Sequence, residues 1–372
     1  MASDRHSSWS FTLLDLLLVA VPAAIALRYV PAWQSGPTLF VVAAIAIVPL
    51  AGWMGRATEQ LASRTSSGVG GFLNATFGNA AELIIALVAL SKGLTGVVKA
   101  SITGSIIGNL LLVLGASILV GGIRYRKQTF NQTAARISAT SLGLGAIALM
   151  IPTVFHRAAM ARPGAWTVEA EQRLSLAIVC VLFLTYFFSL FFHLVTHRDL
   201  FSGPAQEKGE KAEPHWPLWQ SITALSLATA LIAWISEFLV GSIESARHTF
   251  GLTETFVGVV VVALVGNAAE HSTAVWTAWK NKMDLSLTIA TGSSLQMALF
   301  VTPVLVFCSY WFGDPMTLEF SLPEIASIVL SIWIVGQISG DGESNWLEGV
   351  QLLSVYIIIG ILFYYLPALP HH

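Results

Sequence analysis

One short segment that ends in a glutamate occurs twice in this chain, each time inside a strongly apolar stretch. Gly-Asn-Ala-Ala-Glu fills positions 78–82 and again positions 266–270, an offset of 188 residues. The same offset aligns two more pairs without a gap: Lys92 with Lys280, and Thr103-Gly104-Ser105 with Thr291-Gly292-Ser293. Because the chain has 372 residues, it is close to one unit written twice.

The composition is that of an integral membrane protein. Hydrophobic residues make up 55% of the chain and charged residues 11%, whereas soluble domains carry about 25% charged residues. A spanning helix needs about 20 mostly apolar residues. Eleven stretches qualify, near 11–31, 37–62, 70–92, 96–122, 132–155, 172–197, 216–247, 254–280, 283–312, 318–340 and 345–369. The predicted fold class is therefore an all-α polytopic membrane protein.

The repeated segment predicts two five-helix repeats of opposite orientation, preceded by one extra helix. The predicted boundaries are 1–34 for the N-terminus and extra helix, 35–197 for the first repeat, 198–217 for a linker and 218–372 for the second repeat. Glu82 then lies on the third span and Glu270 on the eighth, so their helices cross the membrane in opposite directions. Inverted repeats are typical of secondary transporters, whose binding site lies near the midplane where the repeats meet.

The basic residues predict a cytoplasmic N-terminus. That orientation places 12 Lys and Arg on the cytoplasmic side and 7 on the opposite side, as the positive-inside rule favours. The linker would then be cytoplasmic, where its mixed charge fits either a solvated connection or a cation sensor. Short loops favour a prokaryotic inner membrane over a vacuolar one, and the net charge of −2 gives no indication of nucleic-acid binding.

Glu82 and Glu270 are the strongest candidates for a functional site. A charge near the bilayer centre costs at least about 2.5–3.5 kcal/mol on insertion scales, so such residues are retained where ions or protons pass. On a continuous helix, residues three apart share a face, which would place Asn79 beside Glu82 and Asn267 beside Glu270. The glycine that opens each segment also permits a break in the helix there.

The neighbouring spans add oxygen-bearing side chains. Ser105 and Asn109 share one face of the fourth span, and the ninth span offers Ser293 and Gln296. The repeat offset pairs Asn109 with Met297, so we expect Gln296 to take its place. Carboxylate, hydroxyl and amide oxygens suit Ca²⁺, which takes about 6–8 of them in a flexible shell, better than Mg²⁺. Nothing indicates a soft metal, and no cofactor is predicted.

Three further titratable residues are candidates for moving protons. His271 follows Glu270 directly, and either a proton-transfer role or an ordinary polar contact explains it. Glu59 and Glu237 lie in or near spans and suit access routes, although Glu59 fits the end of a helix equally well. Asp15 is expected at the edge of a helix. The candidates for proton coupling are Glu82, Glu270, His271, Glu59 and Glu237.

The repeated segments carry a family resemblance. The two Gly-Asn-Ala-Ala-Glu segments, the two Thr-Gly-Ser segments and Gly-Ser-Ser-Leu-Gln at 292–296 resemble the Ca²⁺/H⁺ exchangers of the calcium/cation antiporter superfamily. The likeness runs from about residue 35 to the C-terminus. It implies eleven helices with the first outside the repeats, and Glu82 and Glu270 as the central carboxylates for Ca²⁺ and H⁺.

The resemblance also bears on the other candidates and on the coupling ion. It implies Asn79 and Asn267 beside the two carboxylates, His271 next to the second of them, and Glu59 and Glu237 on the access routes. The sodium-driven branch of the superfamily typically has proline before the glutamate. Here Ala81 and Ala269 stand at those positions, which favours protons as the coupling ion.

Site and resemblance together predict a secondary active antiporter that exports cytosolic Ca²⁺ in exchange for H⁺ by alternating access. Two facing buried carboxylates titrate as one unit, and they would bind Ca²⁺ or protons in turn. Na⁺-coupled or monovalent cation/H⁺ exchange is the main alternative. A cation channel is another alternative; it would conduct Ca²⁺ without a counter-gradient, whereas an exchanger requires one. An intramembrane hydrolase is a further alternative, but this chain has no motif such as His-Glu-x-x-His that would support it. No enzyme activity is therefore predicted. The oligomeric state stays open.

Overall fold

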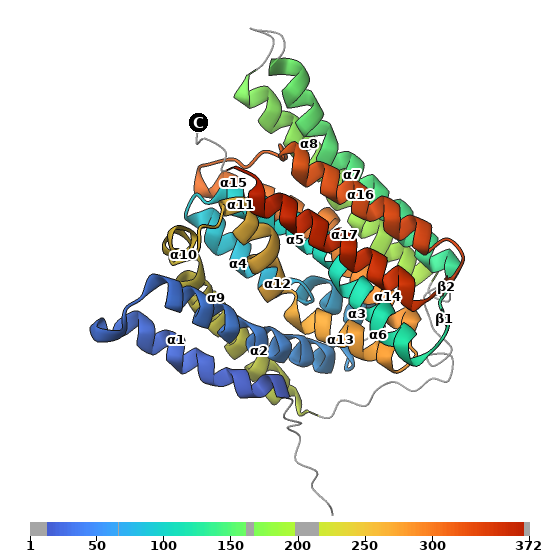
Figure 1. Cartoon of the computed structure of the whole chain (residues 1–372), viewed down its shortest axis with the longest axis horizontal. Helices are drawn as coiled ribbons and strands as arrows, with labels where there is room; N and C mark the ends of the chain where they lie inside the picture. The colour runs from blue at the N-terminus through green and yellow to red at the C-terminus, as the bar shows by residue number, and fades with distance from the viewer. Residues whose placement is uncertain (1–12, 66, 161–166, 198–215, 368–372) are drawn as a thin grey trace, which may run out of the picture.

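The computed structural model describes residues 13–65, 67–160, 167–197 and 216–367, and these residues are almost entirely helical. The exception is a two-stranded antiparallel ladder formed by β1 (Gln128–Thr129) and β2 (Glu343–Ser344), which lies at one edge of the helical bundle in Figure 1. The predicted all-α fold class is therefore confirmed. The predicted linker lies almost wholly outside the described residues.

The helices before the linker include two that continue through a π-helical turn. Their bounds are η1 (Leu13–Val19), α1 (Ala20–Tyr29), η2 (Pro31–Trp33), α2 (Gly36–Ala62), α3 (Ser67–Phe77), α4 (Ala80–Ser91), α5 (Thr95–Ile107), η3 (Gly108–Val113), α6 (Leu114–Arg124), α7 (Gln132–Met160), α8 (Val168–Phe191) and η4 (Phe192–Thr196). Since η3 joins α5 to α6 without a bend, these three form one rod.

The helices after the linker follow the order of those from α2 onward, except that the short helix α10 lies between α9 and α11. Their bounds are α9 (Leu218–Gly241), α10 (Ile243–Phe250), α11 (Glu254–Phe256), η6 (Val257–Val262), α12 (Ala263–Gly266), α13 (Ala268–Trp279), α14 (Met283–Gln296), η7 (Met297–Val301), α15 (Thr302–Phe312), α16 (Leu322–Ile338) and α17 (Trp346–Tyr365). The π-helical turn η7 joins α14 to α15 as η3 joins α5 to α6.

Seven helical segments of the described chain are long and apolar enough to cross a membrane. They are Gly36–Ala62, Thr95–Arg124, Gln132–Met160, Val168–Thr196, Leu218–Gly241, Met283–Phe312 and Trp346–Tyr365. An eighth qualifies if Ile243–Phe250 and Glu254–Gly266, bent by 113°, form one span. A polytopic membrane protein is confirmed, whereas eleven spans stays a prediction, because several expected spans are short or broken helices.

Both copies of the repeated segment interrupt a helix. α3 ends at Phe77 and α4 begins at Ala80, so Gly78 and Asn79 form the turn between them. In the second copy α12 ends at Gly266 and α13 begins at Ala268. The sequence left open a continuous helix or a break, and the break is what forms. Broken helices of this kind supply the binding sites of many transporters.

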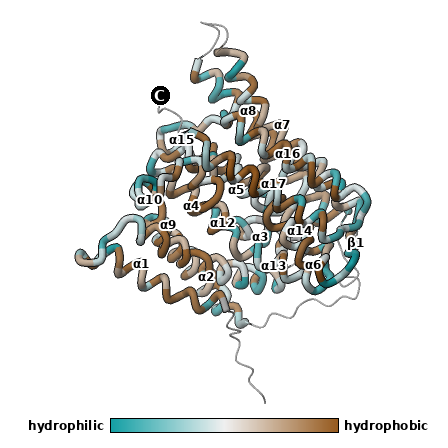
Figure 2. Tube along the Cα trace, viewed as in Figure 1, coloured by the Kyte–Doolittle hydropathy of each residue, from teal (hydrophilic) through white to brown (hydrophobic). Residues whose placement is uncertain are grey.

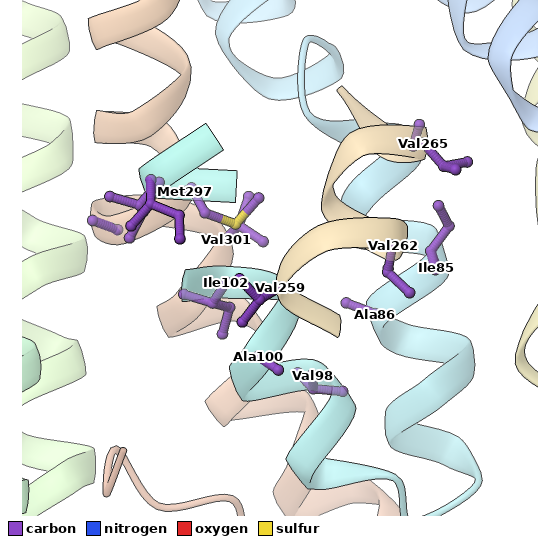
Figure 3. Close-up of a cluster of buried hydrophobic side chains, with 14 of the residues drawn as sticks. Ile85, Ala86, Val98, Ala100, Ile102, Val259, Val262, Val265, Met297 and Val301 are labelled. Carbon is purple, nitrogen blue, oxygen red and sulfur yellow. The ribbon is translucent and has the colours of Figure 1, made fainter. Parts of the chain in front are cut away.

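The interior of the bundle is closely packed around these breaks. α2 packs along α9, and α5 crosses η6. Where α5 crosses η6, a Cβ atom on Gly104 would lie 2.1 Å from the Val259 carbonyl oxygen, so only glycine allows this approach. Figure 3 shows the apolar cluster at this crossing, where Ile102 and Val259 lie side by side. The cluster fixes α5 against η6 and thereby the position of the second break.

The outer helices carry large apolar side chains on exposed faces. Trp311 is 90% exposed and Phe188 is 72% exposed, and Figure 2 shows hydrophobic residues along the outer helices. Apolar patches of this extent mark a surface that meets another apolar phase rather than water. The distribution therefore agrees with a lipid-facing exterior.

Asp15 lies in the first turn of η1, at the helix edge that the sequence predicted, and it is bonded to α2. Its side chain is buried, accepts a hydrogen bond of 2.7 Å from Trp53 Nε1 and forms an ion pair of 2.7 Å with Arg56. The sequence did not predict these partners, because they lie on α2 and only tertiary packing brings η1 against them. The pair fastens the N-terminal helical segment to the bundle.

His156 connects three segments that are distant in the sequence. Its Nδ1 lies 2.9 Å from Glu171 on α8, and its Nε2 lies 3.6 Å from Glu319, which precedes α16. The two carboxylates therefore contact different nitrogens of the His156 ring. This arrangement suits a bridge between helices better than the binding of one ion at a single point.

Candidate cation site

Glu82 and Glu270 occupy equivalent positions at the two helix breaks. Each is the third residue of the helix that follows the break, Glu82 in α4 and Glu270 in α13. The first turn of a helix presents the positive end of the helix dipole, which favours a carboxylate there. Glu82 is buried and Glu270 is half-buried. Each side chain lies against the glycine that opens the other copy of the segment, Glu82 against Gly266 and Glu270 against Gly78.

The two asparagines of the repeated segments bond across the repeats. Asn79 Oδ1 accepts a hydrogen bond of 2.9 Å from Ser293 Oγ, and Asn267 Nδ2 donates one of 3.0 Å to Ser105 Oγ. Both asparagines are N-cap residues, yet neither side chain caps its helix, although Asn is a preferred capping residue. Asn267 Nδ2 also donates to the Ala263 carbonyl oxygen in α12 at 2.9 Å, and the side-chain amides of both asparagines reach the opposite repeat.

Asn109 and Gln296 complete this network in matching positions. Asn109 Nδ2 donates to Asn267 Oδ1 at 3.1 Å and to Ser293 Oγ at 2.9 Å. Asn79 Nδ2 donates to Gln296 Oε1 at 2.5 Å. Asn267 thus has an amide neighbour, Asn109, from the rod α5-η3-α6. Asn79 has one, Gln296, from the counterpart rod α14-η7-α15. Met297, the repeat equivalent of Asn109, is buried and apolar, and the adjacent Gln296 reaches the network as expected.

Several buried oxygen atoms of this cluster have no hydrogen-bond partner within the described residues. They are both carboxylate oxygens of Glu82, Oε2 of Glu270 and Oδ1 of Asn109. Buried polar groups are almost always paired, so four unsatisfied oxygens on three neighbouring elements are unusual. Hard cations take such oxygens as ligands. The chemistry of the donor set therefore suits a cation or protons.

His271 lies beside the second break and faces open space. It lines a cavity of about 670 Å³ between α2, α6, α12 and α13, together with Ala268, Ser272 and Trp276. It also lines the small gap beside Ser105 and Asn267. His271 therefore lies between the polar cluster and this cavity. The location fits proton transfer or gating, and its role stays a prediction.

The structure does not bring Glu59 or Glu237 into the polar cluster. Glu59 is exposed near the end of α2. Glu237 is exposed near the end of α9 and forms an ion pair of 2.8 Å with Lys92. This pair lines a second cavity of about 370 Å³ with Arg28 and Tyr29. No sequence signal indicated this pairing, because Lys92 was notable only as the repeat equivalent of Lys280.

Repeat symmetry extends to the backbone around the network. Asn109 lies within the π-helical turn η3, and Gln296 immediately precedes the π-helical turn η7. Such turns are rare and recur at functional sites. By contrast, Ser294 and Thr291 donate to the carbonyl oxygens of Ala290 and Leu287 in their own helix. Of these three hydroxyl groups, that of Ser293 is the one that bonds the asparagines of the network.

Two broken helices, with paired carboxylates in the turns that follow the breaks, define a polytopic membrane protein of the secondary transporter type. The chain belongs to the sodium/calcium exchanger protein family, which matches residues 35–195 and 220–365.

Individual relatives match over nearly the whole chain. The Ca(2+)/H(+) antiporter of Aphanothece halophytica is 46% identical over 345 residues, which cover 90% of this chain and 91% of that protein. The Ca(2+)/H(+) antiporter ChaA of Bacillus subtilis is 44% identical and covers 94% and 99% of the two chains. The solved structure of native YfkE is similar with a TM-score of 0.81 and 41% identity, covering 95% of this chain and all of that one.

Proposed function

We propose that this protein is a secondary active antiporter that exchanges Ca²⁺ for H⁺ by alternating access. The observation that carries the proposal is the pair of glutamates at the two helix breaks, with buried carboxylate oxygens that have no partner within the described residues. Relatives that are more than 40% identical over most of their length are named as Ca²⁺/H⁺ antiporters. Both lines of support point to the same pair of ions.

Competition for the same oxygens provides the coupling. Glu82 and Glu270 bind Ca²⁺ as carboxylates, and Asn79, Asn267 and the buried amide of Asn109 offer further oxygens. Protons occupy the same carboxylate oxygens when Ca²⁺ is absent. Since two nearby buried charges repel each other strongly in a medium of low dielectric constant, an occupant that neutralises them is required. Ca²⁺ and protons therefore exclude each other at this site.

Neutralisation also explains why the exchange is obligatory. Moving two uncompensated carboxylates through an apolar interior is costly, so the site changes sides only with Ca²⁺ or with protons bound. Ser105, Ser293 and Gln296 tie the two asparagines across the repeats. His271, Glu59 and Glu237 serve the approach of protons in this proposal. No cofactor takes part.

We further propose a prokaryotic plasma membrane with the N-terminus in the cytoplasm, and a division into two five-helix repeats that begin near residues 35 and 218. In that setting the proton gradient drives Ca²⁺ out of the cytoplasm. Sequence identity to bacterial antiporters supports the membrane, and the positive-inside distribution of Lys and Arg supports the orientation.

The test is uptake of radioactive Ca²⁺ into proteoliposomes with an acidic interior, with and without a Na⁺ gradient and a proton uncoupler. We expect uptake that the pH gradient drives, that the uncoupler abolishes and that Na⁺ leaves unchanged. Uptake that requires Na⁺ would favour the sodium-coupled alternative. Downhill Ca²⁺ flux without any counter-gradient would indicate a channel and overturn the proposal.

A further inference from the structure

An ion pair joins the two halves of the chain at one end of the bundle. Lys92, which directly follows α4, lies 2.8 Å from the Glu237 carboxylate on α9 and also donates to the Glu237 carbonyl oxygen at 3.1 Å. α4 carries Glu82 in its first turn. The pair therefore fastens the far end of a site-bearing helix to the long helix α9.

Repeat symmetry gives this pair a counterpart. Lys280 follows α13, the helix that carries Glu270, as Lys92 follows α4. Glu59 lies three residues before the end of α2, and Glu237 lies four residues before the end of α9. α2 and α9 are the first long helices of the two halves and pack against each other. Lys280 is thus the repeat equivalent of Lys92 at the offset of 188, whereas Glu59 matches Glu237 by its place near the end of the first long helix, at an offset of 178.

Chain connectivity places Lys280 and Glu59 at the same end of the bundle, opposite to Lys92. α9 begins beside Glu59, because the Trp216 amide donates to Gln60, and it ends beside Lys92. The segment that leads to α13 begins at Glu254, which lies against Gly96 at the Lys92 end. After the break, α13 therefore reaches the opposite end, where Lys280 stands.

The counterpart pair is open in this structure. Within the described residues, neither Lys280 nor Glu59 forms an ion pair; Lys280 Nζ instead lies 4.7 Å from the centre of the Trp276 ring. Trp276 also lines the cavity of about 670 Å³, to which α2 contributes Val48. One end is thus bridged by an ion pair, while the equivalent pair at the other end is not formed.

We propose that Lys92–Glu237 and Lys280–Glu59 are two alternating ion pairs, of which one is formed in each access state. In the state described here Lys92–Glu237 is closed and the Lys280 end is open. Closure of the cavity would bring Glu59 to Lys280, while α9 leaves Lys92. This inference rests on the proposed alternating access, and it adds a mechanical role for Glu59 and Glu237 to their part in the approach of protons.

The test is the labelling rate of a cysteine in the cavity wall, in detergent and without Ca²⁺. The reporter is Ser272→Cys in protein carrying Cys180→Ala and Cys308→Ala, probed with a hydrophilic maleimide. Glu237→Gln, or Lys92→Gln, should slow labelling about two- to fivefold, the range for a partly exposed ion pair. Adding Glu59→Gln to Glu237→Gln should restore the rate, since both states then lack their pair.

Two controls sharpen this test. Lys282→Gln removes an exposed charge two residues from Lys280 and should leave labelling unchanged. The exchanged pair Lys92→Glu with Glu237→Lys should recover the parent rate. Unaltered labelling in Glu237→Gln, or a second mutation at Glu59 that slows labelling further, would overturn the proposal. The labelling test measures no Ca²⁺ flux. A failure of the proposed Ca²⁺/H⁺ exchange would therefore be detected by the uptake experiment and not by this one.

Discussion

The Glu82 side chain lies directly against Gly266, the glycine that opens the other copy of the repeated segment. A Cβ atom on Gly266 would come within 2.8 Å of Glu82 Cγ. In the converse contact, a Cβ atom on Gly78 would lie 3.5 Å from Glu270 Oε1. Each carboxylate therefore lies over the break of the opposite repeat. The glycines provide room for a carboxylate as well as the turn itself.

This contact predicts a defect in Gly266→Ala. The added methyl group must displace Glu82, and a shift of about 1 Å in a positioned group can cost on the order of 100-fold in rate. We expect Ca²⁺ uptake to fall at least about tenfold while the protein remains folded. Gly336→Ala is the matched control, because nothing lies within 4 Å of a Cβ there. Equal uptake by the two variants would contradict the prediction.

Glu82→Gln and Glu270→Gln should each abolish exchange. The amide keeps the shape of the side chain but removes the charge that Ca²⁺ requires and the oxygen that binds a proton. Uptake into proteoliposomes measures the loss, and the thermal unfolding temperature in detergent checks the fold. Glu244→Gln is the control, since Glu244 is exposed and pairs with Arg247. Near-normal uptake in both variants would refute the assigned roles.

Ser293→Ala should be more damaging than Ser105→Ala, although the two serines are repeat equivalents. Ser293 Oγ bonds Asn79 and Asn109 and lies 3.4 Å from Asn267, whereas Ser105 Oγ accepts one bond from Asn267. Leaving buried partners unsatisfied costs about 1–3 kcal/mol each. The comparison is made by Ca²⁺ affinity and thermal unfolding. A larger effect at Ser105 would contradict this prediction.

Ca²⁺ binding should release protons, and its affinity should depend on pH. As pH falls, protons occupy the carboxylates and the apparent affinity for Ca²⁺ decreases; as pH rises, it increases until both carboxylates are free. Titration calorimetry in buffers with different heats of ionisation counts the protons, of which we expect one to about two. Glu270→Gln should release fewer. An affinity independent of pH would exclude the shared site.

Asp15→Ala should destabilise the protein without acting on the transport site. It removes the carboxylate that Arg56 and Trp53 bond, and with it the contact that holds η1 to α2. Breaking a buried pair costs about 3–5 kcal/mol, and the lower end applies because Arg56 is 26% exposed. Thermal unfolding measures the loss. Glu348→Ala, at an N-terminal cap of α17, should cost only about 1 kcal/mol.

The sequence was most informative where chemistry and spacing agreed. The repeated segment identified Glu82, Glu270, Asn79 and Asn267, and the structure brings the two asparagines together with Ser105 and Ser293. The same offset indicated that Met297 needed a substitute, and Gln296 accepts a bond from Asn79. A polar residue in a long apolar segment is a strong signal because burial is costly there.

The sequence alone determined the class of membrane protein, and it predicted the duplicated plan and the chemical character of the site, since hydrophobic length and carboxylates within apolar segments are local properties. Tertiary structure alone decided which distant residues contact one another. Asp15 with Arg56, Glu237 with Lys92, and Glu82 over Gly266 are contacts between segments far apart in the chain. Their formation depends on the angles at which helices cross, and a one-dimensional pattern does not contain those angles.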